Sequence, residues 1–75
     1  MKELDDAVLT RDLPENGLTA GDVGTVVLVH RGGEGYEVEF TTLDGKTAAV
    51  VTVEAAQLRS VGRREITHAR EMAPA

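Results

Sequence analysis

The sequence predicts a single small domain whose β-strands close into a barrel, and three observations support this prediction. Apolar and polar residues alternate along most of the chain, as between Tyr36 and Phe40, which is the period of a half-buried strand. Turn signals such as Gly32-Gly33 and Asp44-Gly45 follow at short intervals. The chain has 75 residues, enough for one domain at the small end of what folds alone.

Five strands are expected, and their arrangement along the chain indicates the kind of barrel. They span residues 6–9, 24–31, 36–42, 46–53 and 58–61. A long loop from Thr10 to Asp22 follows the first strand, and it is not a helix because Pro14 lacks an N–H and disfavours helical backbone at the residue before it. A single helical turn is expected from Glu54 to Leu58. A long first loop and a helical turn before the last strand are typical of SH3-like barrels, whereas the rival OB barrel needs a longer helix and more chain.

The chain divides into a barrel and a tail. Residues 1–61 form the barrel, and residues 62–75 form a C-terminal tail that is either disordered or adds Glu65 to Ala69 as a strand at an edge. The barrel carries a net charge of −6 and the tail +1, which gives −5 for the whole chain. An acidic domain repels the phosphate groups that supply most non-specific affinity for nucleic acid. Nucleic acid is therefore not expected to be the main partner.

Two turns independently predict which side chains form the core. A two-residue turn at Asp44-Gly45 fixes the register of its hairpin. This register pairs Phe40 with Ala49, Val38 with Val51, and Tyr36 with Val53. A four-residue loop at 32–35 adds the pairs Val29–Val38 and Val27–Phe40 on the same side. All these residues are apolar, and a slip of one residue would turn them to solvent.

The opposite face of the sheet carries the main candidates for partner binding. The predicted register turns Val26, Leu28 and Val50 to this face, beside Glu37 and Glu39. Three aliphatic side chains on a nominally wet face form a patch that a partner can cover. Glu37, Glu39 and Asp44 form an acidic rim that favours a basic partner and speeds its encounter.

Two further segments bear on this patch. The tail, through Ile66 and Met72, is an alternative cover for it, and another alternative is that these residues simply tolerate exposure. In either case no partner is needed. The long first loop is a second candidate surface through Asp12, Glu15 and Asp22, because a loop of that length in so small a domain is often functional.

The residue types that metal or cofactor binding needs are missing. Without cysteine, neither disulfides nor thiolate chemistry is possible, and a reducing cytoplasm is indicated. The N-terminus does not resemble a signal peptide, and the longest apolar runs are too short to span a bilayer. His30 and His68 lie 38 positions apart and belong to no ligand cluster, so neither a metal site nor another cofactor is expected. His30 is interpreted as an exposed cross-strand partner of Glu37.

No catalytic constellation is visible either, and the chain is not expected to be an enzyme. Glu37 and Glu39 alternate with core residues, as on an ordinary solvated strand face, and Ser60 lies outside any nucleophile motif. The two aromatic residues, Tyr36 and Phe40, are assigned to the core. The chain therefore has neither an aromatic groove for proline-rich peptides nor a platform for stacking bases.

Longer motifs resemble a known bacterial family. Four segments are similar to the family called domain of unknown function 4926: residues 9–18 (LTRDLPENGL), 21–27 (GDVGTVV), 36–40 (YEVEF) and 43–47 (LDGKT). Members of this family are small stand-alone proteins without an established activity. The resemblance implies a partner encoded by a neighbouring gene, as in a toxin–antitoxin-like pair.

A shorter run, from Ala20 to Val27, resembles the loop-to-strand entry of other small SH3-like barrels. These include KOW-type ribosomal modules, the variable chain of ferredoxin-thioredoxin reductase and the nitrile hydratase β-subunit. By this resemblance Gly21 supplies a tight turn and Gly24 close backbone packing.

The leading functional hypothesis is a non-catalytic interaction module that binds one protein partner, with an antitoxin or immunity role against a small basic toxin as its most concrete form. One alternative is an RNA- or ribosome-binding KOW-type module that uses Arg63, Arg64 and Arg70 of the tail. Another is a regulatory subunit of a larger enzyme. Homodimerisation through an edge strand or the apolar face stays open.

Overall fold

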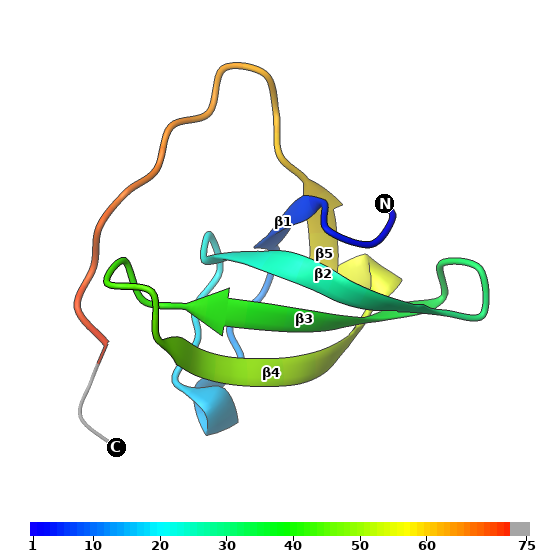
Figure 1. Ribbon diagram of the computed structural model, residues 1–75, viewed down its shortest axis with the longest axis horizontal. Coiled ribbons are helices and arrows are strands. Elements are labelled where there is room, and N and C mark those ends of the chain that lie inside the picture. Colours follow the sequence, from blue (N-terminus) through cyan, green and yellow to red (C-terminus); the bar gives the residue numbers. More distant parts are fainter. Residues whose placement is uncertain (73–75) are drawn as a thin grey trace.

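The computed structural model describes residues 1–72 as a sheet of five antiparallel strands (Figure 1). The strands are β1 (Asp6–Leu9), β2 (Val23–His30), β3 (Gly35–Thr41), β4 (Thr47–Glu54) and β5 (Leu58–Ser60). Two 3-10 turns, η1 (Pro14–Asn16) and η2 (Ala55–Gln57), lie in the connections. None of the helical segments in residues 1–72 has the length and hydrophobicity needed to cross a membrane. The all-β prediction is confirmed, and each strand begins and ends within one residue of its expected bounds.

The strand order across the sheet is β4-β3-β2-β1-β5. Strand β2 pairs with both β1 and β3, and the first and last strands of the chain pair with each other. Figure 1 shows the sheet bending strongly, so that β1 and β5 cross the direction of β3 and β4. With a long loop after β1 and a 3-10 turn before β5, this is the architecture of a small SH3-like barrel.

The β3–β4 hairpin has the predicted register, but its turn is one residue longer than predicted. Tyr36 lies opposite Val53, Val38 opposite Val51 and Phe40 opposite Ala49. The Thr42 amide donates to the Lys46 carbonyl (2.8 Å), so Leu43, Asp44 and Gly45 form a three-residue turn. Gly45 takes the left-handed conformation there, with φ of 90°. An irregularity next to Phe40 then restores the predicted pairing.

The β2–β3 register differs from the prediction. The connecting loop spans 31–34, one residue earlier than expected, so Val29 lies opposite Tyr36. The pairing then shifts between Val26 and Leu28, which leaves Val27 as the extra residue of a β-bulge and places Val26 opposite Val38. Val26 is 0% exposed and belongs to the core, whereas Val27 is 39% exposed. The assignment of Val26 to a partner-binding face is therefore wrong, because the bulge turns its side chain inward.

The core is a small apolar cluster inside the barrel. Its buried members are Ala7, Leu9, Leu18, Val26, Tyr36, Val38, Phe40, Val53 and Leu58. Gly24 lets β2 approach β3 closely, since a Cβ there would lie 2.6 Å from Cγ1 of Val38 and 2.9 Å from the Glu39 carbonyl oxygen. Gly21, with φ of 95°, occupies a left-handed turn before β2. Both glycines thus play the parts that the barrel resemblance implies.

The tail is neither an added strand nor a free end over residues 62–72. No strand follows β5 in these residues. The tail leaves β5, arches away from the barrel and returns beside the β3–β4 turn (Figure 1). Two ion pairs hold it, Arg59–Glu65 near its start and Arg70–Asp22 near its end. We call residues 62–72 the arch.

Candidate functional site

The outward side of β2, β3 and β4, which we call the outer face, brings together most of the predicted partner-binding residues. Leu28, Glu37 and Thr52 lie side by side in one row across the three strands. The next row contains Thr25, Glu39 and Val50, which are also neighbours across the strands. The Leu28 residue is 44% exposed and Val50 is 57% exposed, so two aliphatic side chains of this face remain open to solvent.

Hydrogen bonds fix the two glutamates of the outer face. Oε2 of Glu37 lies 2.6 Å from Nε2 of His30 and accepts a hydrogen bond from the Thr52 hydroxyl (2.7 Å). The contact with His30, followed by that with Thr52, lowers the pKa of Glu37 below its ordinary value. His30 was predicted to face Glu37, and the contact exists, although the residue directly opposite Glu37 is Leu28. The Thr47 hydroxyl donates to Glu39 (2.6 Å).

The outer face is acidic, and within residues 1–72 its glutamates form no ion pair with a lysine or an arginine. Strands β2, β3 and β4 contain no lysine or arginine, and His30 is their one basic side chain. Glu54 extends the acidic row along β4, since it follows Val50 and Thr52 on the same side of the strand. Asp6 adjoins Thr25 from β1, where the Thr25 hydroxyl lies 3.5 Å from its carboxylate.

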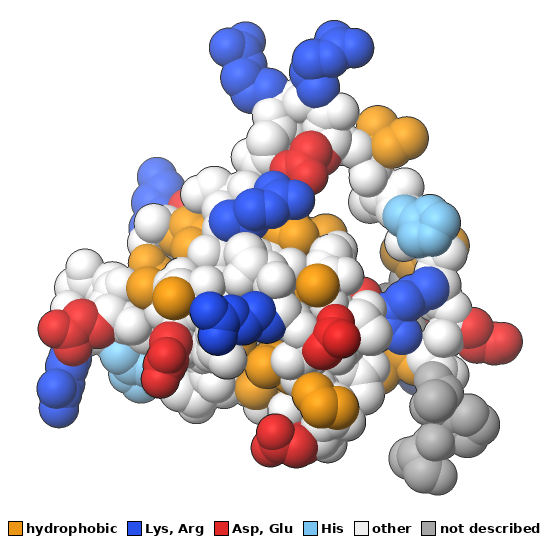
Figure 2. Space-filling view, turned by 180° about the vertical axis from the view of Figure 1, so that it is seen from behind, with side chains coloured by type: hydrophobic (Ala, Val, Ile, Leu, Met, Phe, Trp, Pro, Cys, Tyr) orange, Lys and Arg blue, Asp and Glu red, His pale blue; other side chains and the backbone are white. Residues whose placement is uncertain are grey.

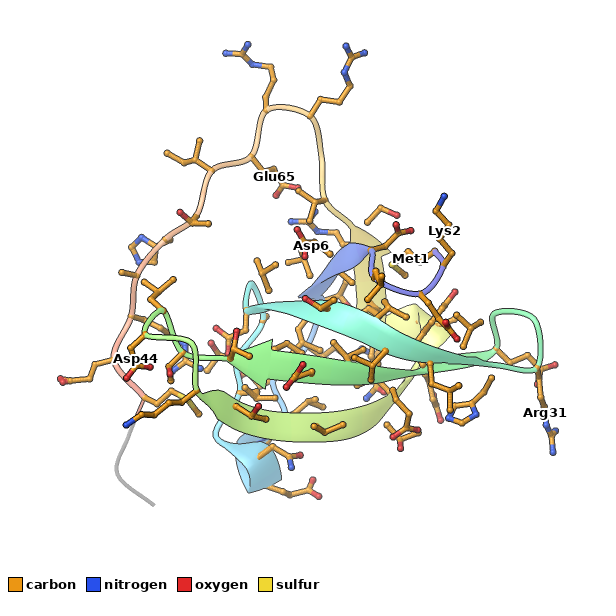
Figure 3. The ribbon with its side chains drawn as sticks, viewed as in Figure 1. Met1, Lys2, Asp6, Arg31, Asp44 and Glu65 are labelled. Atoms are coloured by element: carbon orange, nitrogen blue, oxygen red, sulfur yellow. The ribbon has the colours of Figure 1, made fainter. Side chains whose placement is uncertain are left out.

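Sequence reasoning missed Asp6 and Glu54. Alternation along β4 is the signal that could have found Glu54, because it puts this residue on the same side as Val50. Asp6 is placed there by its pairing with Thr25 of β2, a long-range contact that alternation does not predict. Asp44, assigned to the acidic rim, lies in the β3–β4 turn at the opposite end of the molecule from Arg31 (Figure 3).

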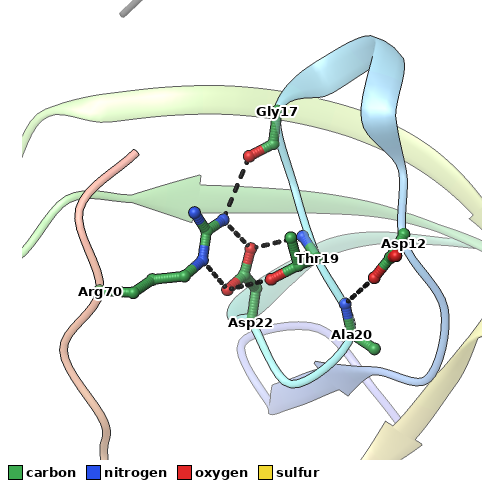
Figure 4. Close-up of polar contacts among 6 residues, drawn as sticks. All are labelled: Asp12, Gly17, Thr19, Ala20, Asp22 and Arg70. Carbon is green, nitrogen blue, oxygen red and sulfur yellow. Dashed lines mark hydrogen bonds and ion pairs between the residues drawn. The ribbon is translucent and has the colours of Figure 1, made fainter. Parts of the chain in front are cut away.

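The candidate residues of the long loop are separate from the outer face. One carboxylate oxygen of Asp12 accepts a hydrogen bond from the Ala20 amide (2.8 Å), which holds the loop closed on itself (Figure 4). Glu15 lies exposed in η1. Leu18, in the same loop, is buried in the core. The loop is therefore an ordered part of the barrel, with Asp12 in a structural contact and Glu15 free at the surface.

The arch is fastened to this same loop and not to the outer face. The Arg70 guanidinium pairs with both carboxylate oxygens of Asp22, with Nε 2.8 Å from Oδ1, and donates to the Gly17 carbonyl (3.1 Å) (Figure 4). Arg70 is the largest cause of the lowered pKa of Asp22, and hydrogen bonds from Thr19 add to it. Met72 packs against the edge of the core nearby. The expectation that Met72 covers Leu28 and Val50 is not met, because Met72 packs near Gly17 and both residues stay exposed.

The other end of the arch is held by Arg59. Both terminal nitrogens of its guanidinium donate to the Glu65 carboxylate, each at 2.7 Å, and Glu65 points back from the arch toward the barrel (Figure 3). With the Gly62 amide, this contact lowers the pKa of Glu65 from 4.5 to about 2. Ile66, expected as a possible cover, is 92% exposed. Arg63 and Arg64 are also exposed, and Figure 2 shows basic side chains at the outermost turn of the arch.

The arch and the barrel border an open cavity of about 830 Å³ whose lining includes Asp6 and Val8 of β1 and residues of the β3–β4 turn, but neither Leu28 nor Val50. Among residues 1–72 no group of three or more His, Asp or Glu side chains is arranged to hold a metal ion. The outer face thus remains the surface on which exposed aliphatic and acidic side chains meet.

The strand order, the long loop and the 3-10 turn define this protein as a small SH3-like barrel with an acidic outer face. The chain belongs to a family described as Domain of unknown function (DUF4926), whose sequence model matches residues 3–60. This match confirms the resemblance drawn from the motifs, and it ends at the last residue of β5. Searches of the curated proteins and of the solved structures found no match.

Proposed function

We propose that this protein is a non-catalytic interaction module that binds a basic protein through its outer face. One observation carries the proposal: Leu28 and Val50 stay exposed on a face whose three strands contain glutamates but neither lysine nor arginine. Here the exposed aliphatic side chains lie next to carboxylates that are already held in place. A basic partner that covers this face would bury the first and pair with the second.

The two kinds of side chain would contribute differently. Burial of Leu28 and Val50 under a partner removes apolar surface from water and slows dissociation. Glu37 and Glu39, already held by neighbouring hydroxyls, present carboxylates that need little reordering when a cation arrives. Their charge attracts a basic partner over a distance of about one Debye length, roughly 8 Å at physiological salt.

An antitoxin or immunity role against a small basic toxin is the most specific form of this proposal. It is supported by the net charge of −5 and by the glutamates of the outer face, which suit a basic partner. If the protein is instead a regulatory subunit, the same face would bind a larger enzyme. The two roles therefore differ in the size of the partner.

The alternative of RNA binding through the tail is less favoured by the contacts of the arch. Arg70 already pairs with Asp22, which leaves Arg63 and Arg64 exposed for phosphate contacts. Two arginines beside a barrel of net charge −6 supply little of the phosphate attraction that such binding needs.

Affinity capture of the tagged protein from its native host, at low and at high salt, tests the proposal. We expect one small basic protein in equal amount, released at high salt. The Leu28→Asp variant should lose this protein and keep the circular dichroism spectrum of the wild type. Ile66→Asp is the matched control, because it adds the same charge at a residue that is 92% exposed on the arch, and it should capture normally.

Two results would contradict the proposal. Normal capture by Leu28→Asp would remove the outer face from the interaction. Retention of RNA that depends on Arg63 and Arg64 would favour the nucleic-acid alternative.

A further inference from the structure

Strand β4 is an open edge of the sheet. It is the first strand in the order β4-β3-β2-β1-β5 and pairs with β3 alone (Figure 1). The Ala55 amide donates to the Glu34 carbonyl (3.1 Å), and this bond fixes the phase of the ladder. In an antiparallel pair the residues that exchange hydrogen bonds alternate, so Val53, Val51 and Ala49 bond to β3. The backbone groups of Val50 and Thr52 consequently point away from β3.

Among residues 1–72 no other segment takes up these groups. The backbone hydrogen bonds of the turns, loops and caps include none from the N–H or C=O of Val50 or Thr52. The next outward amide, that of Glu54, is already satisfied by the side-chain oxygen of Gln57 (2.8 Å). Two neighbouring outward residues thus offer two donors and two acceptors in the spacing of a strand.

The edge also lacks the usual protection against strand pairing. Natural sheets protect edges with lysine, proline, bulges or very short strands. Strand β4 is eight residues long, contains neither lysine nor proline, and has its one irregularity at the end near the turn. The other edge strand, β5, has three residues, and its Arg59 binds the arch. The two edges of this sheet are therefore not equivalent.

The side chains around β4 specify what a paired strand must contain. On the outward side, a new strand would lie next to Val50, Thr52 and Glu54, with Glu37 and Glu39 one strand further on. A strand in which lysine or arginine alternates with aliphatic residues suits these neighbours. On the inward side it would cover Val51 and Ala49, which are only partly buried at the rim of the core and call for apolar partners.

We infer that β4 accepts a strand from a basic protein, in which apolar residues face the core and basic residues face the acids of the outer face. This inference rests on the proposed function and adds its mode of binding, in which backbone hydrogen bonds of Val50 and Thr52 extend the sheet. A second copy of this chain suits the edge less well, because each copy carries a net charge of −5 and would bring Glu54 and Glu37 beside more acids.

The test uses a backbone change that leaves every side chain in place. A chain of 75 residues can be assembled by chemical ligation with the Thr52 amide N-methylated. This amide makes no bond to β3, so the barrel should keep its stability while the edge is blocked. N-methylation of the Ile66 amide on the exposed arch is the matched control. The probe is a fluorescent octapeptide of alternating valine and lysine. The control peptide carries glutamate in place of lysine.

We expect the lysine peptide to bind the wild-type chain and the Ile66 control, to shift the amide NMR signals of Val50 and Thr52, and to weaken as salt rises. N-methylation at Thr52 should reduce its affinity about tenfold or more, through a lost hydrogen bond and the steric block. The glutamate peptide should not bind.

Several outcomes would overturn the inference. Unchanged peptide affinity after N-methylation at Thr52 would rule out edge pairing, as would the absence of any binding of the lysine peptide. Equal binding of the glutamate peptide would rule out the role of the acids. Sedimentation of the free chain as a dimer that dissociates on N-methylation would assign the edge to a second copy. In each case the capture experiment with Leu28→Asp still decides the proposed function independently.

Discussion

Replacing Val26 and Val27 in turn by threonine tests the β-bulge that decides which side chains of β2 face the core. Threonine has nearly the shape of valine and exchanges one methyl for a hydroxyl, so the change reports on polarity at each site. Val26 is 0% exposed and lies opposite Val38 in the core. Its backbone N–H and C=O are already bonded to Asp5 and Leu4, at 2.9 and 2.7 Å.

The expected magnitudes follow from this burial. A hydroxyl buried without a partner costs about 1–3 kcal/mol in proteins, so Val26→Thr should lower the free energy of unfolding by about 2 kcal/mol. A domain of this size has a total stability of about 4–11 kcal/mol, so the loss would be large. Val27 is 39% exposed, and a surface change there should stay within about 0.5 kcal/mol.

Urea denaturation followed by circular dichroism measures both variants. The midpoint of Val26→Thr should fall while the slope m stays constant. In a thermal melt the same loss corresponds to a decrease in Tm of about 8–16 °C for a domain of this length. If Val27→Thr were the destabilising change and Val26→Thr were silent, β2 would run without the extra residue, and Val26 would belong to the outer face after all.

Two further predictions concern close packing and the arch. Gly24→Ala should destabilise the barrel by about 1–3 kcal/mol in the same assay, because its Cβ would overlap the Val38 side chain; an unchanged midpoint would mean that β2 and β3 are further apart. Because Arg70 lowers the pKa of Asp22, their ion pair stabilises the attached arch fully above pH 3.8 and loses this effect as the pH falls through the lowered pKa. Acid, or Arg70→Gln at neutral pH, should therefore shift the Met72 methyl NMR signal to that of a free side chain without unfolding the barrel, and an unmoved signal would show that Arg70 does not hold the arch.

Local sequence signals determined the strands and one of the two predicted registers. Hairpin β3–β4 depends on a short turn and on alternation within its own two strands, and the pairing of Phe40 with Ala49 was predicted correctly. The turn itself was one residue longer than predicted, and an irregularity in the ladder compensated for it. Four of the seven predicted partner-binding residues, namely Leu28, Glu37, Glu39 and Val50, do lie together on the outer face.

The bulge in β2 could not be predicted from its own sequence. Val26 and Val27 are identical residues in adjacent positions, and alternation alone cannot decide which of them faces the core. The choice depends on two partners at once, since β2 bonds to the N-terminal segment through Val26 and to β3 further along. A strand shared by both halves of a bent sheet uses the extra residue to change direction.

The position of the arch was equally inaccessible to sequence reasoning. Arg70 binds Asp22 across 48 positions, and no periodic pattern links a tail arginine to one particular aspartate among many acids. The sequence by itself determined an acidic, cysteine-free barrel with aliphatic residues on its solvent-exposed outer face. Only the tertiary structure decided that Val26 is buried, that the tail leaves Leu28 and Val50 uncovered, and that β4 is a free edge. These three features depend on contacts between segments far apart in the sequence. A local sequence pattern does not contain the free energies of such contacts.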